Sequence, residues 1–194
     1  MTLHRLIRLY FLMMFPTVSL GIAGTVSYLG SFTTANDVFL QSVVISEGSI
    51  VTVQTLSYGG GTNAAGTVIL PGGFDPIVTM FDSTGQFLDE NDDGTCPPAT
   101  EDNGNCFDSS LNIVLNTSGT YLFALTVAPN FAAGSTLADG FYNIGDFAGR
   151  SQDYAVDVTV SPINDVPEPS ERIPTTVVAI IVAFYGLTNR LRLK

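Results

Sequence analysis

Short segments in the middle of the chain alternate hydrophobic and polar or smaller residues with a period of two. The clearest examples are residues 111–115, 121–127 and 154–160, in which every second residue is apolar. Because successive side chains of a strand point to opposite faces of its sheet, each segment directs one row of side chains at a core. With the other apolar segments, the predicted strands are residues 26–32, 38–45, 49–56, 76–81, 86–88, 111–115, 121–127 and 154–160.

Connections rich in Gly, Asn, Asp and Pro separate these strands, and no sustained helical period occurs between residues 25 and 165. About eight such strands predict an all-β fold, an antiparallel β-sandwich with a jelly-roll connection. The connections 57–75, 89–108 and 129–152 are longer than turns. Loops of this length in a compact domain are functional or disordered, so we expect the chemistry of the domain to lie there.

The pattern changes at the N-terminus. Residues 1–24 combine Arg5 and Arg8 with an apolar run and then small residues, which is typical of a secretory signal peptide with a helical core. An uncleaved anchor helix is the alternative interpretation. The sequence therefore predicts export of the residues that follow.

A second apolar run, residues 175–187, lies near the C-terminus. As a helix it would be about 20 Å long, so it would cross a hydrocarbon core of about 30 Å with tilting or local thinning. The basic residues after it, Arg190, Arg192 and Lys194, would lie on the cytoplasmic side. We therefore predict three parts: a signal peptide (1–24), an exported domain (25–165) and a C-terminal sorting segment (166–194).

The tripeptide Pro167-Glu168-Pro169 precedes this C-terminal helix. The tripeptide, apolar run and basic end together resemble the PEP-CTERM sorting signal of exported proteins of Gram-negative bacteria. The resemblance implies processing by a signal peptidase and an exosortase-like enzyme, an inner-membrane intermediate, and a final place at the cell surface or in an exopolysaccharide matrix. Pro174 departs from the family pattern, and an ordinary C-terminal anchor is the alternative.

The predicted exported domain contains a second set of motifs, which are Gly73-Phe74-Asp75-Pro76, Phe81-Asp82, Gly85, Asn91-Asp92-Asp93-Gly94 and Gly119-Thr120-Tyr121. These motifs resemble the bacterial pre-peptidase C-terminal domain and, more closely, a family of exported PEP-CTERM proteins of unassigned activity. The resemblance covers most of residues 30–160. It implies a β-sandwich, of which several relatives are calcium-binding accessory modules rather than catalysts.

The excess of acidic residues excludes one class of partner and favours another. The chain has 18 acidic and 7 basic residues, and between residues 25 and 165 Arg150 is its only basic residue. Nucleic-acid binding needs a basic surface, so this class of function is excluded. A domain this acidic repels itself unless cations screen the charge. Calcium is available outside the cell, so the acidity favours a calcium-binding module.

The most specific local motif is the first half of a calcium loop. Asp89, Asn91, Asp93 and Gly94 match the pattern D-x-[DN]-x-[DN]-G, in which alternate oxygen ligands turn toward one cation. The second half of the motif is missing, so other carboxylates must complete the site. The alternative is a solvated acidic loop. The candidates for completing the site are Asp75, Asp82 and Asp108.

Cys96 and Cys106 lie close together in the same acidic connection. In an exported chain such a pair is predicted to form a disulfide. Closing this loop would stabilise the fold by roughly 3 kcal/mol in the chain-entropy model. Its role would be to hold the acidic loop in shape.

Catalysis is not expected. The chain's single histidine, His4, lies in the predicted signal peptide, so triads that need histidine are excluded from the mature protein. The leading hypothesis is a calcium-stabilised structural protein. The alternative is a calcium-dependent carbohydrate-binding module, and a glycoside hydrolase built on two carboxylates is a more distant one. Loop aromatics could contact sugar or pack beneath their own loops; they are Tyr58, Phe74, Phe131, Phe141, Tyr142 and Phe147.

Overall fold

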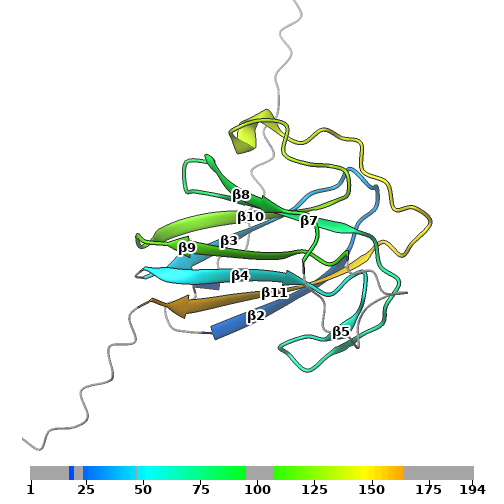
Figure 1. Cartoon of the computed structure of the whole chain (residues 1–194), viewed down its shortest axis with the longest axis horizontal. Helices are drawn as coiled ribbons and strands as arrows, with labels where there is room; N and C mark the ends of the chain where they lie inside the picture. The colour runs from blue at the N-terminus through cyan, green and yellow to red at the C-terminus, as the bar shows by residue number, and fades with distance from the viewer. Residues whose placement is uncertain (1–17, 20–23, 47, 95–106, 164–194) are drawn as a thin grey trace, which may run out of the picture. The chain divides into compact units, whose positions relative to one another are not determined.

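The computed structural model describes residues 18–19, 24–46, 48–94 and 107–163 (Figure 1). Among them no helix is long and apolar enough to cross a membrane. Several predicted features lie outside the described residues: most of the signal peptide 1–24, the 175–187 helix, and the residues Cys96, Cys106, Pro167, Glu168, Pro169, Arg190, Arg192 and Lys194. Of the predicted signal helix, Val18–Ser19 is described, and it is a strand rather than a helix.

The described chain forms two main antiparallel sheets. Sheet A has the order β1 (Val18–Ser19), β3 (Phe39–Ile45), β10 (Gly119–Val127), β7 (Pro76–Phe81) and β8 (Phe87–Asn91). Sheet B has the order β2 (Gly24–Ser31), β11 (Asp153–Pro162), β4 (Ser49–Thr55) and β9 (Ser110–Leu115). The short β1 alone pairs in parallel, with β3. A small ladder joins β5 (Gly61–Thr62) to β6 (Val68–Ile69).

The eight longer strands pair in a nested way. Strand β2 pairs with β11, β3 with β10, β4 with β9, and β7 with β8. Each outer pair encloses the next along the chain, which is the jelly-roll arrangement of eight strands in two sheets. The prediction of an antiparallel all-β sandwich is therefore confirmed, and each predicted strand corresponds to an observed one.

The core lies between the two sheets and follows the predicted alternation. Val53 and Val158 of sheet B pair side by side, and both are fully buried against residues of sheet A such as Phe123 and Leu125. Strand β7 is buried at all six positions, which explains why Thr79 is its only polar residue. Its outer face is covered by the connection between β10 and β11, whose Phe141 ring lies edge-on to Phe81 at 6.5 Å.

The connection from β10 to β11 contains the short 3₁₀ helix η2 (Leu137–Asp139), which lies above β8 and β10 in Figure 1. Strand β8 is longer than predicted, because it continues through Asp89 and Glu90 to Asn91. Charged residues are tolerated there because β8 is the edge of its sheet. The Glu90 carboxylate also accepts hydrogen bonds from the Thr79 hydroxyl at 2.7 Å and the Ala132 N–H at 3.0 Å.

Candidate metal centre

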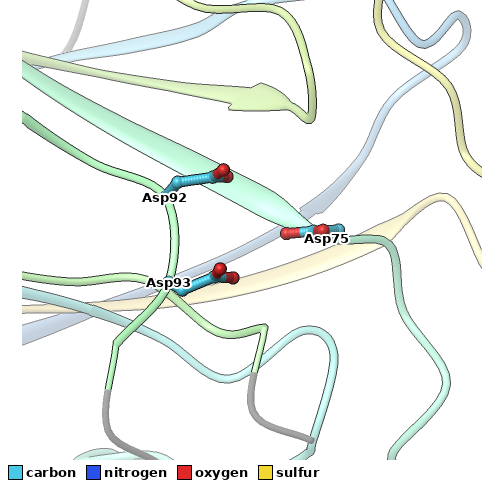
Figure 2. A group of neighbouring side chains, drawn as sticks. All are labelled: Asp75, Asp92 and Asp93. Carbon is cyan, nitrogen blue, oxygen red and sulfur yellow. The ribbon is translucent and has the colours of Figure 1, made fainter.

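Three aspartates meet where β7 begins and β8 ends. Asp75 immediately precedes β7, and Asp92 and Asp93 immediately follow β8. Because the two strands are antiparallel, with Val78 opposite Asn91, the start of β7 and the end of β8 lie next to each other at the same end of sheet A. One carboxylate oxygen from each aspartate lies within 4.8 Å of the other two. Figure 2 shows the side chains of Asp92 and Asp93 directed toward Asp75. We call these three residues the aspartate cluster.

Ser109, just before β9, holds the two strand ends together. Its buried hydroxyl lies 2.5 Å from the carbonyl oxygen of Pro76 and 2.6 Å from that of Asp92. The hydroxyl therefore links the start of β7 to the end of β8. A further hydrogen bond links the end of β8 to β9, since the Asn91 side-chain oxygen accepts the Ser110 N–H at 2.7 Å.

Gly94 completes the turn that follows Asp93. Its N–H donates to the carbonyl oxygen of Asp108 at 2.7 Å. A β-carbon on this residue would lie 2.6 Å from the Ser110 nitrogen, which is closer than real contacts allow. Glycine is therefore required for the backbone to approach β9, and this approach keeps the Asp92–Asp93 turn beside Asp75.

Asp108 serves the fold rather than the cluster. Its carboxylate is 2% exposed and accepts the Thr55 hydroxyl at 2.8 Å and the N–H groups of Ser57, Tyr58 and Gly59 at 2.7–3.0 Å. A buried carboxylate with this many donors is well satisfied. Asp108 thus fixes the loop that follows β4.

The electrostatics of the cluster are unfavourable without a cation. Burial raises the pKa of Asp75 to about 7, with further contributions from the negative charges of Asp92, Asp93 and Asp108, which Arg150 partly opposes. Burial likewise raises the pKa of Asp92 to about 6, helped by the charges of its neighbours. Within the described part of the chain, the Oδ1 atoms of Asp75 and Asp92 are buried and accept no hydrogen bond. Two buried carboxylate oxygens of the cluster therefore have no hydrogen-bond donor among the described residues.

This arrangement suits a hard divalent cation. Calcium takes six to eight oxygen ligands at about 2.3–2.6 Å, and aspartate supplies one or two oxygens. Three aspartates would thus fill about half of the coordination shell and leave positions for carbonyl oxygens, water or a ligand. A bound cation would also remove the cost of burying like charges side by side.

The structure assembles the predicted residues differently from the sequence motif. Asp75 and Asp93 are in the cluster, whereas Asp89 and Asn91 belong to strand β8, so the tight loop implied by their spacing does not form. Asp89 is exposed and accepts the N–H of its neighbour Glu90.

Asp82 lies at the opposite end of β7, about 23 Å from Asp75 at 3.3 Å per residue. Its carboxylate accepts the N–H groups of Thr84 and Gln86 in the β7–β8 turn. Asp92 and Ser109 were not predicted from the sequence as part of the site. A prediction that β8 reaches Asn91 would have placed Asp92 at the strand end.

No family model and no curated protein matches the chain. The pre-peptidase C-terminal domain of a collagenase from Bacillus anthracis is 9% identical, with 76% of this chain and 96% of that domain aligned at a TM-score of 0.38. PliG of Aeromonas hydrophila, a periplasmic inhibitor of g-type lysozyme, is 18% identical, with 75% and 94% aligned at a TM-score of 0.38. At these TM-scores neither likeness assigns a family or a function to this chain.

Proposed function

We propose that this chain is an exported, non-catalytic structural protein whose jelly roll binds one calcium ion at Asp75, Asp92 and Asp93. The observation that carries the proposal is the pair of buried Oδ1 atoms without hydrogen-bond donors among the described residues, in a cluster of three carboxylates. Burying like charges together is unfavourable, and a cation at their centre reverses the sign of that interaction.

Calcium is favoured over magnesium by the kind of site. Magnesium demands near-ideal octahedral geometry and gives up its water reluctantly, whereas calcium accepts irregular sets of oxygen ligands. The cluster is formed by the ends of two strands and a turn; Asp75 and Asp92 are partly buried and Asp93 is exposed. The role of the ion would be to fasten the β8–β9 connection to the start of β7 in a protein of the cell surface or the exopolysaccharide matrix.

Thermal unfolding of the purified exported protein tests the calcium site. A site with a dissociation constant of 10 µM gains about 2.7 kcal/mol in 1 mM calcium. We expect the melting temperature to rise by several degrees relative to excess EGTA. The variant Asp93→Asn removes a ligand charge and is expected to abolish most of this rise.

Asp89→Asn is the matched control, because Asp89 belongs to the same sequence motif but lies in strand β8. It is expected to keep the full calcium effect. If calcium leaves the melting temperature of the unmodified protein unchanged, the calcium proposal is wrong. Two carboxylates of the aspartate cluster would then be candidates for the acid and nucleophile of a glycoside hydrolase.

We also propose that residues 166–194 direct sorting by an exosortase-like enzyme. The support is the order of Pro167-Glu168-Pro169, an apolar run and a basic end. Glu168→Ala is expected to reduce the surface-exposed or matrix-bound fraction, measured by cell fractionation, and to leave an inner-membrane precursor. Glu171→Ala changes a nearby acid outside the tripeptide and should sort normally. Normal sorting of the Glu168→Ala protein would contradict the exosortase proposal.

A further inference from the structure

A pocket of about 370 Å³ adjoins the aspartate cluster. Asp75 belongs to both, so a ligand in the pocket lies beside an ion held by the cluster. The pocket combines aromatic and charged side chains, which come from the loop after β4, the start of β7, the residues before β9 and the connection before β11. Those that matter here are Tyr58, Asp75, Phe107, Asp146, Phe147 and Arg150.

The aromatic walls are held in place by contacts of their own. The rings of Tyr58 and Phe107 pack edge to face with centroids 4.9 Å apart. The Arg150 guanidinium lies 3.5 Å from the centroid of the Tyr58 ring, and its Nε donates to the carbonyl oxygen of Gly73 at 2.5 Å. Phe147 packs on the buried Phe74 with centroids 5.8 Å apart. The side chains that line the pocket are therefore held by contacts with one another and with the core.

The loop aromatics differ in burial and in their position relative to the pocket. Phe74 and Phe141 are buried in the fold, as expected for aromatics that pack beneath their own loops. Tyr58 and Phe147 are partly exposed in the pocket, together with Phe107. Phe131 and Tyr142 do not line the pocket. Tyr58, Phe147 and Phe107 therefore supply the rings that a ligand in the pocket can contact.

Aromatic faces beside a hard cation suit a sugar. The C–H face of a pyranose packs on aromatic rings, and two neighbouring hydroxyl oxygens can fill open positions of a calcium ion, which accepts neutral oxygen ligands. Charge selects among sugars. The 16 acidic residues between residues 25 and 165 face a single basic one, so long-range repulsion disfavours uronic acids and other anionic sugars.

We propose that this pocket binds a neutral sugar residue, with two neighbouring hydroxyl oxygens on the calcium ion of the aspartate cluster and its apolar face on Phe147 and Phe107. The inference rests on the proposed calcium site and names the ligand that the site would take. It also gives the exported domain a direct means of attachment to an extracellular polysaccharide.

Titration calorimetry of the purified exported protein tests this with the methyl glycosides of mannose, galactose, glucose and fucose, each in calcium and in EGTA. We expect at least one to bind with a millimolar dissociation constant in calcium and to give no heat in EGTA. Phe147→Leu keeps an apolar contact with Phe74 but removes the ring face, and is expected to weaken this binding by about tenfold. Its calcium-induced rise in melting temperature should be unchanged, which shows that the fold and the ion site are intact.

Tyr142→Ala is the matched control, because Tyr142 lies in the same connection, is 58% exposed and is outside the pocket. It should bind sugar normally. A calcium-induced rise in melting temperature without heat from any of the four glycosides would overturn the sugar site and leave the calcium site standing. The sugar site would also be overturned if sugar binding persisted in EGTA or were unchanged in Phe147→Leu. Tighter binding of glucuronate, titrated in the same way, than of the four neutral glycosides would overturn it too. Absence of the calcium effect would overturn both proposals.

Discussion

Replacing Asp108 by alanine is expected to lower the free energy of unfolding by about 3 kcal/mol, because a buried donor left without its acceptor costs about 1–3 kcal/mol. The carboxylate accepts hydrogen bonds from Thr55 and from three consecutive N–H groups, those of Ser57, Tyr58 and Gly59. Removing it leaves these donors buried together. Urea unfolding of the variant and the unmodified protein measures the difference.

The same variant separates two roles for Asp108. If the residue positions a loop, stability falls equally in calcium and in EGTA, and calcium still raises the melting temperature of the variant. If it is a metal ligand, the loss appears mainly in calcium. Asp108→Asn keeps one oxygen acceptor, so its free energy of unfolding should lie between those of Asp108→Ala and the unmodified protein. A loss below about 1 kcal/mol for Asp108→Ala would contradict the buried hydrogen-bond network described here.

In EGTA, the protein is expected to become less stable as the pH rises from 5 to 8. The pKa of Asp75 is raised to about 7 and that of Asp92 to about 6 in the folded state, above the usual value of 3.8. The folded protein therefore binds more protons than the unfolded chain between about pH 4 and 7. The resulting stability is present at the acidic end of this window and is lost as the pH passes the folded pKa values.

Melting temperatures measured at pH 5 and pH 8 in EGTA check this expectation. Asp75→Asn replaces the carboxyl group with a neutral amide, so its melting temperature should depend less on pH. Saturating calcium should reduce or invert the trend, because protons and calcium compete for the same carboxylates. The pKa values of Asp37 and Asp82 are lowered by hydrogen bonds, chiefly to Thr34 and Thr84, so they titrate below this range and do not confuse it. Equal stability at both pH values in EGTA would contradict the buried-carboxylate interpretation.

The strands were predictable because burial of one face imposes a period of two. Residues 154–160 show this directly, since Val156, Val158 and Val160 are buried in the core. The segment 76–81 was also predicted as a strand. Its burial on both faces has a tertiary cause, because the connection containing Phe141 covers its outer face. Strand β8 was predicted too short, since its acidic residues have low strand propensity and are accommodated by an edge position.

The candidate site was harder to predict because its ligands come from two strand ends rather than from one loop. The motif beginning at Asp89 assumes a local turn, whereas the chain is extended through Asn91. The pairing of β7 with β8 shows which residues meet at the strand ends. Continuing the register of Thr79 with Glu90 and Val78 with Asn91 would bring Asp93 opposite Pro76, next to Asp75. A hairpin recognised from the Asp82–Gly85 turn would therefore have predicted Asp75 and Asp93 as neighbours.

The nested order of the strands also places the first and last of the longer strands side by side. Strand β11 ends at Pro162 beside the start of β2, since Val160 pairs with Gly24, so the described chain enters and leaves at one end. Ser151, just before β11, pairs with Gly73, two residues from Asp75, at the other end. Ten strand residues, about 33 Å, separate the two ends. The aspartate cluster and the adjoining pocket therefore lie at the end of the sheets farthest from Pro162, where the described chain leaves the domain.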